Sequence, residues 1–229
     1  MVDVLHTVDQ GVASHVVANA MWAFAVVRKV FGGGTQKDQI ANLYAHLNKW
    51  YSSVKETTKV QGKLTVERLR TQGQWPKLKA KAAATRHLAS YALHLCQEFG
   101  GASEEDREMR AVYTLLVRFY NISSSESQFL GDSAKAELPK LGARLVGIYT
   151  SLAARAKTNK VRMWKLQPKL HLFQHLCEWQ CLTHGNPRYY WTYADEDLAG
   201  KMSEVAESCH PATMATSAMF KWLHLCYAK

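Results

Sequence analysis

Carboxylates at three places in the sequence could carry metal-dependent chemistry. They are Asp3, Asp9 and the run Asp195-Glu196-Asp197. Carboxylate oxygens are the ligands that Mg²⁺ prefers, and a pair of such ions about 3.5–4 Å apart is the machinery of many phosphodiester-cleaving enzymes. A structural interpretation competes for the run Asp195-Glu196-Asp197, because acids at the start of a helix cap it and favour its dipole. For Asp3 the competing interpretation is a solvated residue near the terminus. Spacing alone therefore does not predict a nuclease.

Histidines and cysteines gather at a second place, on a helix predicted to begin at Pro168. His171 and His175 lie four residues apart, and Cys177 and Cys181 repeat that spacing. Residues at i and i+4 share a helix face, and imidazole and thiolate are zinc ligands. Core packing is the competing interpretation, since a free cysteine commonly behaves as a small buried apolar residue. The apolar neighbours of the two cysteines favour packing.

Basic residues are concentrated in two segments of a chain whose net charge is +10. Ten basic and two acidic residues lie at 49–86, and six basic and no acidic residues lie at 155–169. Aromatic residues are interleaved with them, a combination that suits phosphate contacts supported by stacking. The candidate nucleic-acid-binding residues are Lys77, Lys79, Lys81, Arg86, Lys160, Arg162, Lys165 and Lys169. A solvated face of a basic helical protein would give the same pattern.

The hydrophobic pattern that must position these residues is helical. Apolar residues make up 47% of the chain and charged residues 21%, as in globular proteins with a core. Apolar spacing, caps and Gly or Pro breaks predict helices at 7–31, 35–56, 65–70, 79–99, from Ser103, at 126–157 with a bend or break at Pro139, and from Pro168, Asp195 and Pro211. We predict a mainly α, single multi-helix domain over residues 1–229, with at most one short N-terminal strand at VDVL.

Three short blocks resemble, in the same order, motifs of DDE-type transposases of the CACTA-like eukaryotic superfamilies. The opening DVLHTVDQGV resembles the block D-x-x-H-x-x-D/K-x-G/N, which carries the second catalytic Asp of that family. PKLHLFQHL resembles the family's H-x-x-x-H-L helix, and YYWTYADEDLAG resembles its aromatic and acidic block with the catalytic Glu. The resemblance covers most of the chain, although each block is short.

The resemblance implies a fold and a metal site. The family has an RNase H-like fold with a long helical insertion, which would make residues 1–6 a remnant strand, 7–182 the insertion and 190–229 the C-terminal helices. Asp3 matches the second metal-binding Asp and Glu196 the third carboxylate, with Asp195 or Asp197 as weaker matches for the latter. His6 would support the site, and Mg²⁺ or Mn²⁺ would be held by Asp3 and Glu196 if the site is intact.

One departure limits the activity that the resemblance implies. The family's first catalytic Asp lies upstream of the D-x-x-H block, and this chain begins two residues before that block. We therefore expect a truncated, transposase-derived protein that binds DNA and does not cleave it alone. A second copy or a longer transposase chain that supplies the missing Asp would restore a nuclease. The rival hypothesis is a helical scaffold whose basic face docks an acidic protein and has no nucleic-acid role.

The location expected from the sequence is the nucleus or the cytosol. Five cysteines form an odd set, and the first residues carry no basic n-region, which favours reduced thiols in a reducing compartment. The longest apolar stretch, Ala20–Val27, is shorter than the roughly 20 residues of a membrane span. No membrane partner is therefore expected.

Overall fold

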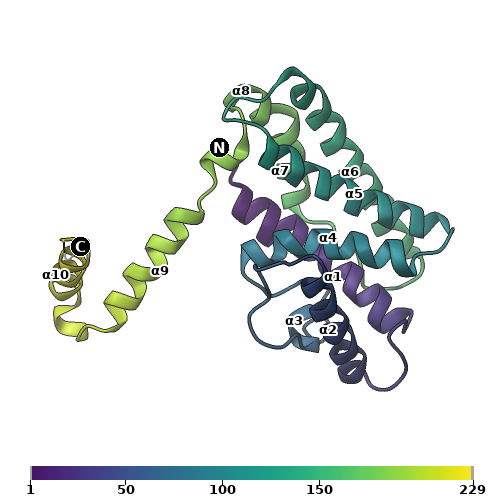
Figure 1. The fold of residues 1–229 in the computed structure, drawn as a ribbon, viewed down its shortest axis with the longest axis horizontal. Helices are drawn as coiled ribbons and strands as arrows, with labels where there is room; N and C mark the ends of the chain where they lie inside the picture. The colour runs from purple at the N-terminus through teal and green to yellow at the C-terminus, as the bar shows by residue number, and fades with distance from the viewer. Residues whose placement is uncertain (1, 228–229) are drawn as a thin grey trace. The chain divides into compact units, whose positions relative to one another are not determined.

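The structure is a computed structural model that describes the backbone of residues 2–227 and their side chains, apart from those of 194–197 and 225–226. Within this part of the chain every regular element is a helix (Figure 1), which confirms the mainly α prediction. The chain divides into two compact units, Met1–Tyr190 and Trp191–Lys229, and each is described by itself.

The short strand expected at residues 1–6 does not form in the described residues. Val2 and Asp3 have no regular structure, and helical backbone begins at Val4. The Asp3 carboxylate accepts hydrogen bonds from the backbone N–H groups of Leu5 at 3.2 Å and His6 at 2.8 Å, donors that a first helical turn otherwise leaves unpaired. The apolar alternation that suggested a strand is instead the start of a helix buried on several sides.

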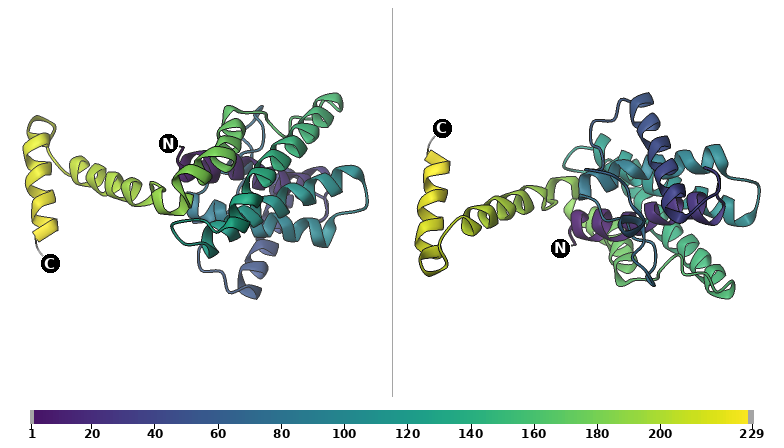
Figure 2. Two further views of the ribbon diagram at one scale, coloured as in Figure 1. Left: turned by 90° about the horizontal axis from the view of Figure 1, so that it is seen from above. Right: turned by 90° about the horizontal axis from the view of Figure 1, so that it is seen from below.

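One long N-terminal helix runs through the first unit, as both views in Figure 2 show. It consists of three segments that follow one another without a break: η1 (Leu5–Ala13), α1 (Ser14–Trp22) and η2 (Ala23–Val27). The first and the third segment are π-helical. Most of its residues are buried, as the sequence predicts from apolar residues on nearly every face. It packs against α4 (Ala82–Phe99) and α7 (Pro168–His175).

The same helix has the length and composition of a membrane span. The most apolar 18-residue window of Leu5–Val27 has a mean hydropathy of 1.2, and 83% of that window is buried inside the protein. A helix at the centre of a protein core is apolar on all sides and meets this criterion as readily as a membrane helix. The finding alone therefore favours neither environment, and the expected lack of a membrane partner stays a prediction.

The remaining elements of the first unit surround this helix. They are α2 (Gln36–Ser53), α3 (Val66–Leu69), α5 (Glu104–Ser125), α6 (Asp132–Thr158), η3 (Leu176–Gln180, π-helical), α8 (Cys181–His184) and η4 (Pro187–Tyr190, a 3-10 turn). Predicted caps are present: Thr35 forms a capping box with Asp38, and the Ser103 hydroxyl accepts a hydrogen bond from the backbone N–H of Asp106. Helix α6 continues through Pro139 without ending, and α5 packs against both α4 and α6.

In the part of the second unit that the structure describes, two α-helices pack on each other. Helix α9 (Tyr193–Glu207) is followed by a 3-10 turn, η5 (Pro211–Thr213), and by α10 (Met214–Tyr227). The helix expected from Asp195 begins two residues earlier, at Tyr193. Pro211 opens the 3-10 turn that leads into the last helix.

Candidate nucleic-acid interface

The connection between α6 and α7 is a basic loop, residues 159–167, with an unusual backbone. Lys160 and Trp164 have positive φ angles of 53° and 58°, a region that costs a non-glycine residue about 1–2 kcal/mol. Burial of Trp164 offsets this cost: its backbone N–H donates to Asn19 Oδ1 at 3.0 Å, and its ring meets Tyr149 edge-on at 5.4 Å. The Tyr149 hydroxyl also donates to the Lys165 carbonyl at 3.0 Å. The core therefore fixes the shape of this loop.

The fixed loop directs cations outward. Trp164 and Met163 point into the core, whereas Arg162, Lys165 and Leu166 are exposed. A loop anchored at its centre loses little conformational freedom when a ligand contacts its ends. Preorganisation of this kind favours a binding surface over a merely solvated loop.

The loop lies against the second basic segment of the sequence. Arg162 Nη1 donates to the Gly73 carbonyl at 2.5 Å. The Trp75 ring lies 6.0 Å from the Arg162 guanidinium and 5.7 Å from Lys165 Nζ, distances typical of cation–π contacts. The two basic runs that the sequence separates thus meet at Trp75, beside a cleft of about 530 Å³ whose lining includes Trp75, Lys157, Lys160, Arg162 and Lys165.

Electrostatic coupling extends this cationic surface beyond the cleft. Partial burial and the nearby charge of Arg162 lower the pKa of Arg70, whose guanidinium lies 4.9 Å from the Trp22 ring. Partial burial and the charge of Lys77 likewise lower the pKa of Lys169, against a smaller opposing effect of Asp3. The charges of Arg162 and Lys77 thus act on Arg70 and Lys169, and a surface that gathers cations in this way attracts anions.

A buried histidine lies beneath the same surface. His15 donates from Nδ1 to the Pro76 carbonyl at 2.8 Å. Burial lowers its pKa to about 4, and the charges of Lys77, Lys165 and Lys169 act in the same direction. His15 is therefore neutral near pH 7 and adds no charge to the cationic surface.

The structure brings together only some of the predicted nucleic-acid-binding residues. Lys160, Arg162 and Lys165 line the cleft. Lys77 and Lys169 lie close enough to His15 for their charges to lower its pKa. The remaining candidates, Lys79, Lys81 and Arg86, are not among the residues that line the cleft. Sequence reasoning did not single out Lys157, which lines the cleft, or Arg70. Arg155, in the second basic run, is paired with Glu104 and Glu108 at 2.9 and 3.2 Å.

Asn19 offers a test of the loop's anchoring. We expect Asn19→Ala to lower the free energy of unfolding by about 1–3 kcal/mol, because the buried N–H of Trp164 loses its acceptor. Chemical denaturation monitored by circular dichroism measures the change. Asn42→Ala is the matched control, since Asn42 donates to the Phe31 carbonyl at an exposed site. Equal losses in both variants would contradict the anchoring role.

The predicted catalytic pair is only partly within the described residues. Besides its two backbone hydrogen bonds, the Asp3 carboxylate contacts His6 Nδ1 at 2.7 Å, so His6 does lie beside Asp3. Asp3 therefore caps the start of the N-terminal helix, a role that the sequence analysis did not assign to it. The side chains of Asp195, Glu196 and Asp197 lie outside the described residues, and a shared metal ion between Asp3 and Glu196 stays a prediction. Asp9 is buried and accepts a hydrogen bond from the Tyr120 hydroxyl.

The histidine and cysteine group separates into two parts. Cys177 and Cys181 are buried, and burial raises the pKa of both thiols, that of Cys181 to about 12. This confirms the core-packing interpretation of the two cysteines. His171 and His175 are exposed and contact each other through their Nε2 atoms at 2.9 Å.

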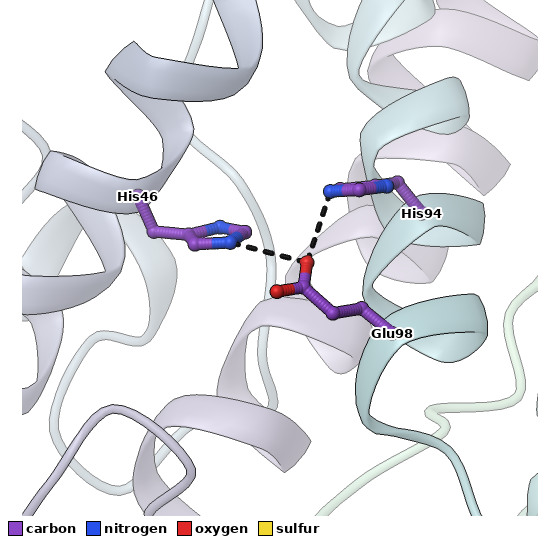
Figure 3. Close-up of side chains that lie close together, drawn as sticks. All are labelled: His46, His94 and Glu98. Atoms are coloured by element: carbon purple, nitrogen blue, oxygen red, sulfur yellow. Dashed lines mark ion pairs between the residues drawn. The ribbon is translucent and has the colours of Figure 1, made fainter.

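A different set of metal-ligating side chains converges in the described part of the chain. His46 of α2 and His94 and Glu98 of α4 place their ligand atoms within 4.8 Å of one another (Figure 3). The i, i+4 spacing of His94 and Glu98 is visible in the sequence, but nothing there indicates that His46 joins them. Sequence reasoning missed this cluster for that reason.

Comparisons with protein-family profiles, with curated proteins and with solved structures gave no match for this chain.

Proposed function

We propose that this chain binds DNA through the cationic surface formed by its two basic segments. The observation that carries the proposal is a pair of contacts made by Arg162, one with the Gly73 carbonyl and one with the Trp75 ring. These contacts bring the two basic segments together around one aromatic ring. Among the residues that the structure describes, the exposed Lys77, Arg162 and Lys165 form no ion pair with a carboxylate. Their charges are therefore available to phosphates.

The chemistry of this surface favours the phosphate backbone over base reading. Lysine and arginine neutralise phosphates and release counterions, which gives affinity without sequence preference. The Trp75 ring is partly exposed, and an aromatic ring flanked by cations supports stacking on an unpaired base. We therefore expect this chain to bind DNA with little preference for the DNA sequence.

The resemblance to transposases suggests where this protein comes from. We propose a transposase-derived protein that keeps a DNA-binding helical region and is catalytically incomplete. The capping contacts of Asp3 support the second part, because its carboxylate already accepts two backbone hydrogen bonds.

Titration of labelled DNA at several salt concentrations tests the proposal. If the cationic surface contacts about four to six phosphates, the logarithm of the binding constant falls against the logarithm of salt with a slope of about −4 to −5. A matched incubation with Mg²⁺ or Mn²⁺ should leave the DNA uncut. Lack of binding at low salt would contradict the proposal and favour the acidic protein partner.

A further inference from the structure

We propose that His46, His94 and Glu98 form a Zn²⁺ site that joins α2 to α4. Two imidazoles and one carboxylate are a known set of three protein ligands for zinc, in which a water molecule takes the fourth position. This site lies apart from the cationic surface and uses none of its residues. The inference is therefore independent of the proposed DNA binding.

The distances between the ligand atoms suit a tetrahedral metal. His46 Nε2 and His94 Nε2 lie 3.2 and 3.0 Å from the same oxygen, Glu98 Oε2, and Figure 3 shows both rings directed at that carboxylate. Ligand atoms around tetrahedral zinc are about 3.3–3.5 Å apart, given bonds of about 2.0–2.2 Å. The two nitrogen–oxygen pairs therefore need to open by only a few tenths of an ångström. The two imidazole nitrogens lie within 4.8 Å of each other, and side-chain rotation brings them to the tetrahedral distance.

A second layer of contacts orients His46. Its Nδ1 contacts the hydroxyl of the buried Tyr91 at 2.9 Å, which leaves Nε2 directed toward the carboxylate. A metal-ligating histidine usually donates its other ring N–H to such a partner, and this fixes the tautomer. The Phe31 and Phe99 rings lie 5.0 and 5.7 Å from the His46 ring. They limit the directions in which the imidazole can turn.

Access also suits a metal. The Glu98 and His94 side chains are 40% and 37% exposed. Solvent therefore reaches the cluster from one side, which admits the ion and the fourth ligand.

Calorimetric titration of the chelator-treated full chain with ZnCl₂ tests the proposal. We expect one equivalent of Zn²⁺ to bind and to raise the melting temperature, because binding to the folded state alone stabilises it. His46→Gln, His94→Gln and Glu98→Gln should each weaken this binding by at least about 100-fold. Tyr91→Phe should weaken it by about tenfold, the range of second-layer substitutions.

Two controls separate this site from other imidazoles. His87→Gln changes a histidine of the same helix that pairs with Glu56 at 2.8 Å, and it should leave the Zn²⁺ affinity unchanged. The double variant His171→Gln and His175→Gln removes the exposed histidine pair on α7. It should still bind one equivalent of Zn²⁺ with unchanged affinity. Unchanged affinity in His94→Gln, or loss of the equivalent only in the α7 double variant, would overturn the proposal. Circular dichroism confirms that each variant is folded.

Discussion

Reversing the charge of Arg162 and Lys165 together should weaken DNA binding by about 100-fold near physiological salt. Both side chains lie within 6.0 Å of the Trp75 ring and line the same cleft. In the proposed complex, the double substitution Arg162→Glu and Lys165→Glu would remove two phosphate contacts and add two repulsive charges. Each lost contact also lowers the magnitude of the salt slope by about 1.

The control must change the net charge equally at another place. Lys140 and Arg144 are exposed on α6, so Lys140→Glu with Arg144→Glu matches the double substitution in charge. Fluorescence anisotropy with the same DNA compares the two variants. If both weaken binding equally, net charge carries the affinity and the cleft does not.

Local signals in the sequence predicted most of the helices. Thr35 with Asp38, and Ser103 with its following acids, are caps whose hydrogen bonds form within one turn, so short-range patterns suffice. The buried N-terminal helix was predictable because apolar residues cover nearly all its faces. The prediction of a strand at residues 1–6 was wrong, because an alternation of four residues cannot distinguish a strand from the first turn of a buried helix.

The arrangement of the cationic surface could not be predicted in the same way. Each basic segment is visible in the sequence, but their meeting at Trp75 depends on the path of α6 and on the anchoring of Trp164 by Asn19. Left-handed backbone at a tryptophan has no local signal, because it is held only by tertiary contacts. The proposed zinc site could not be predicted from the sequence for a similar reason. Helix α4 supplies two ligands whose i, i+4 spacing is visible in the sequence, but the third ligand comes from another helix.

His15 should make the stability of the fold depend on pH between about 6.5 and 4. Its pKa is about 4 in the folded protein, against 6.5 as the ordinary value, so in this range the unfolded chain binds a proton that the folded chain does not. Stability is then fully present above pH 6.5 and falls as the pH decreases. Each pKa unit corresponds to about 1.4 kcal/mol, which gives a total loss of about 3 kcal/mol near pH 4.

The measurement is urea unfolding of the wild type and of His15→Gln between pH 7.5 and pH 5. Above pH 5 most carboxylates stay ionised, so a histidine accounts for most of the slope in this window. Glutamine retains an N–H group for the Pro76 carbonyl but cannot be protonated, so we expect His15→Gln to lose most of this slope. His46→Gln is the comparison, because the pKa of the partly buried His46 is also lowered, and this variant should lose a smaller part of the slope. If His15→Gln keeps the full slope, the histidine beneath the cationic surface is not the group that titrates, and its neutral state does not stabilise the fold.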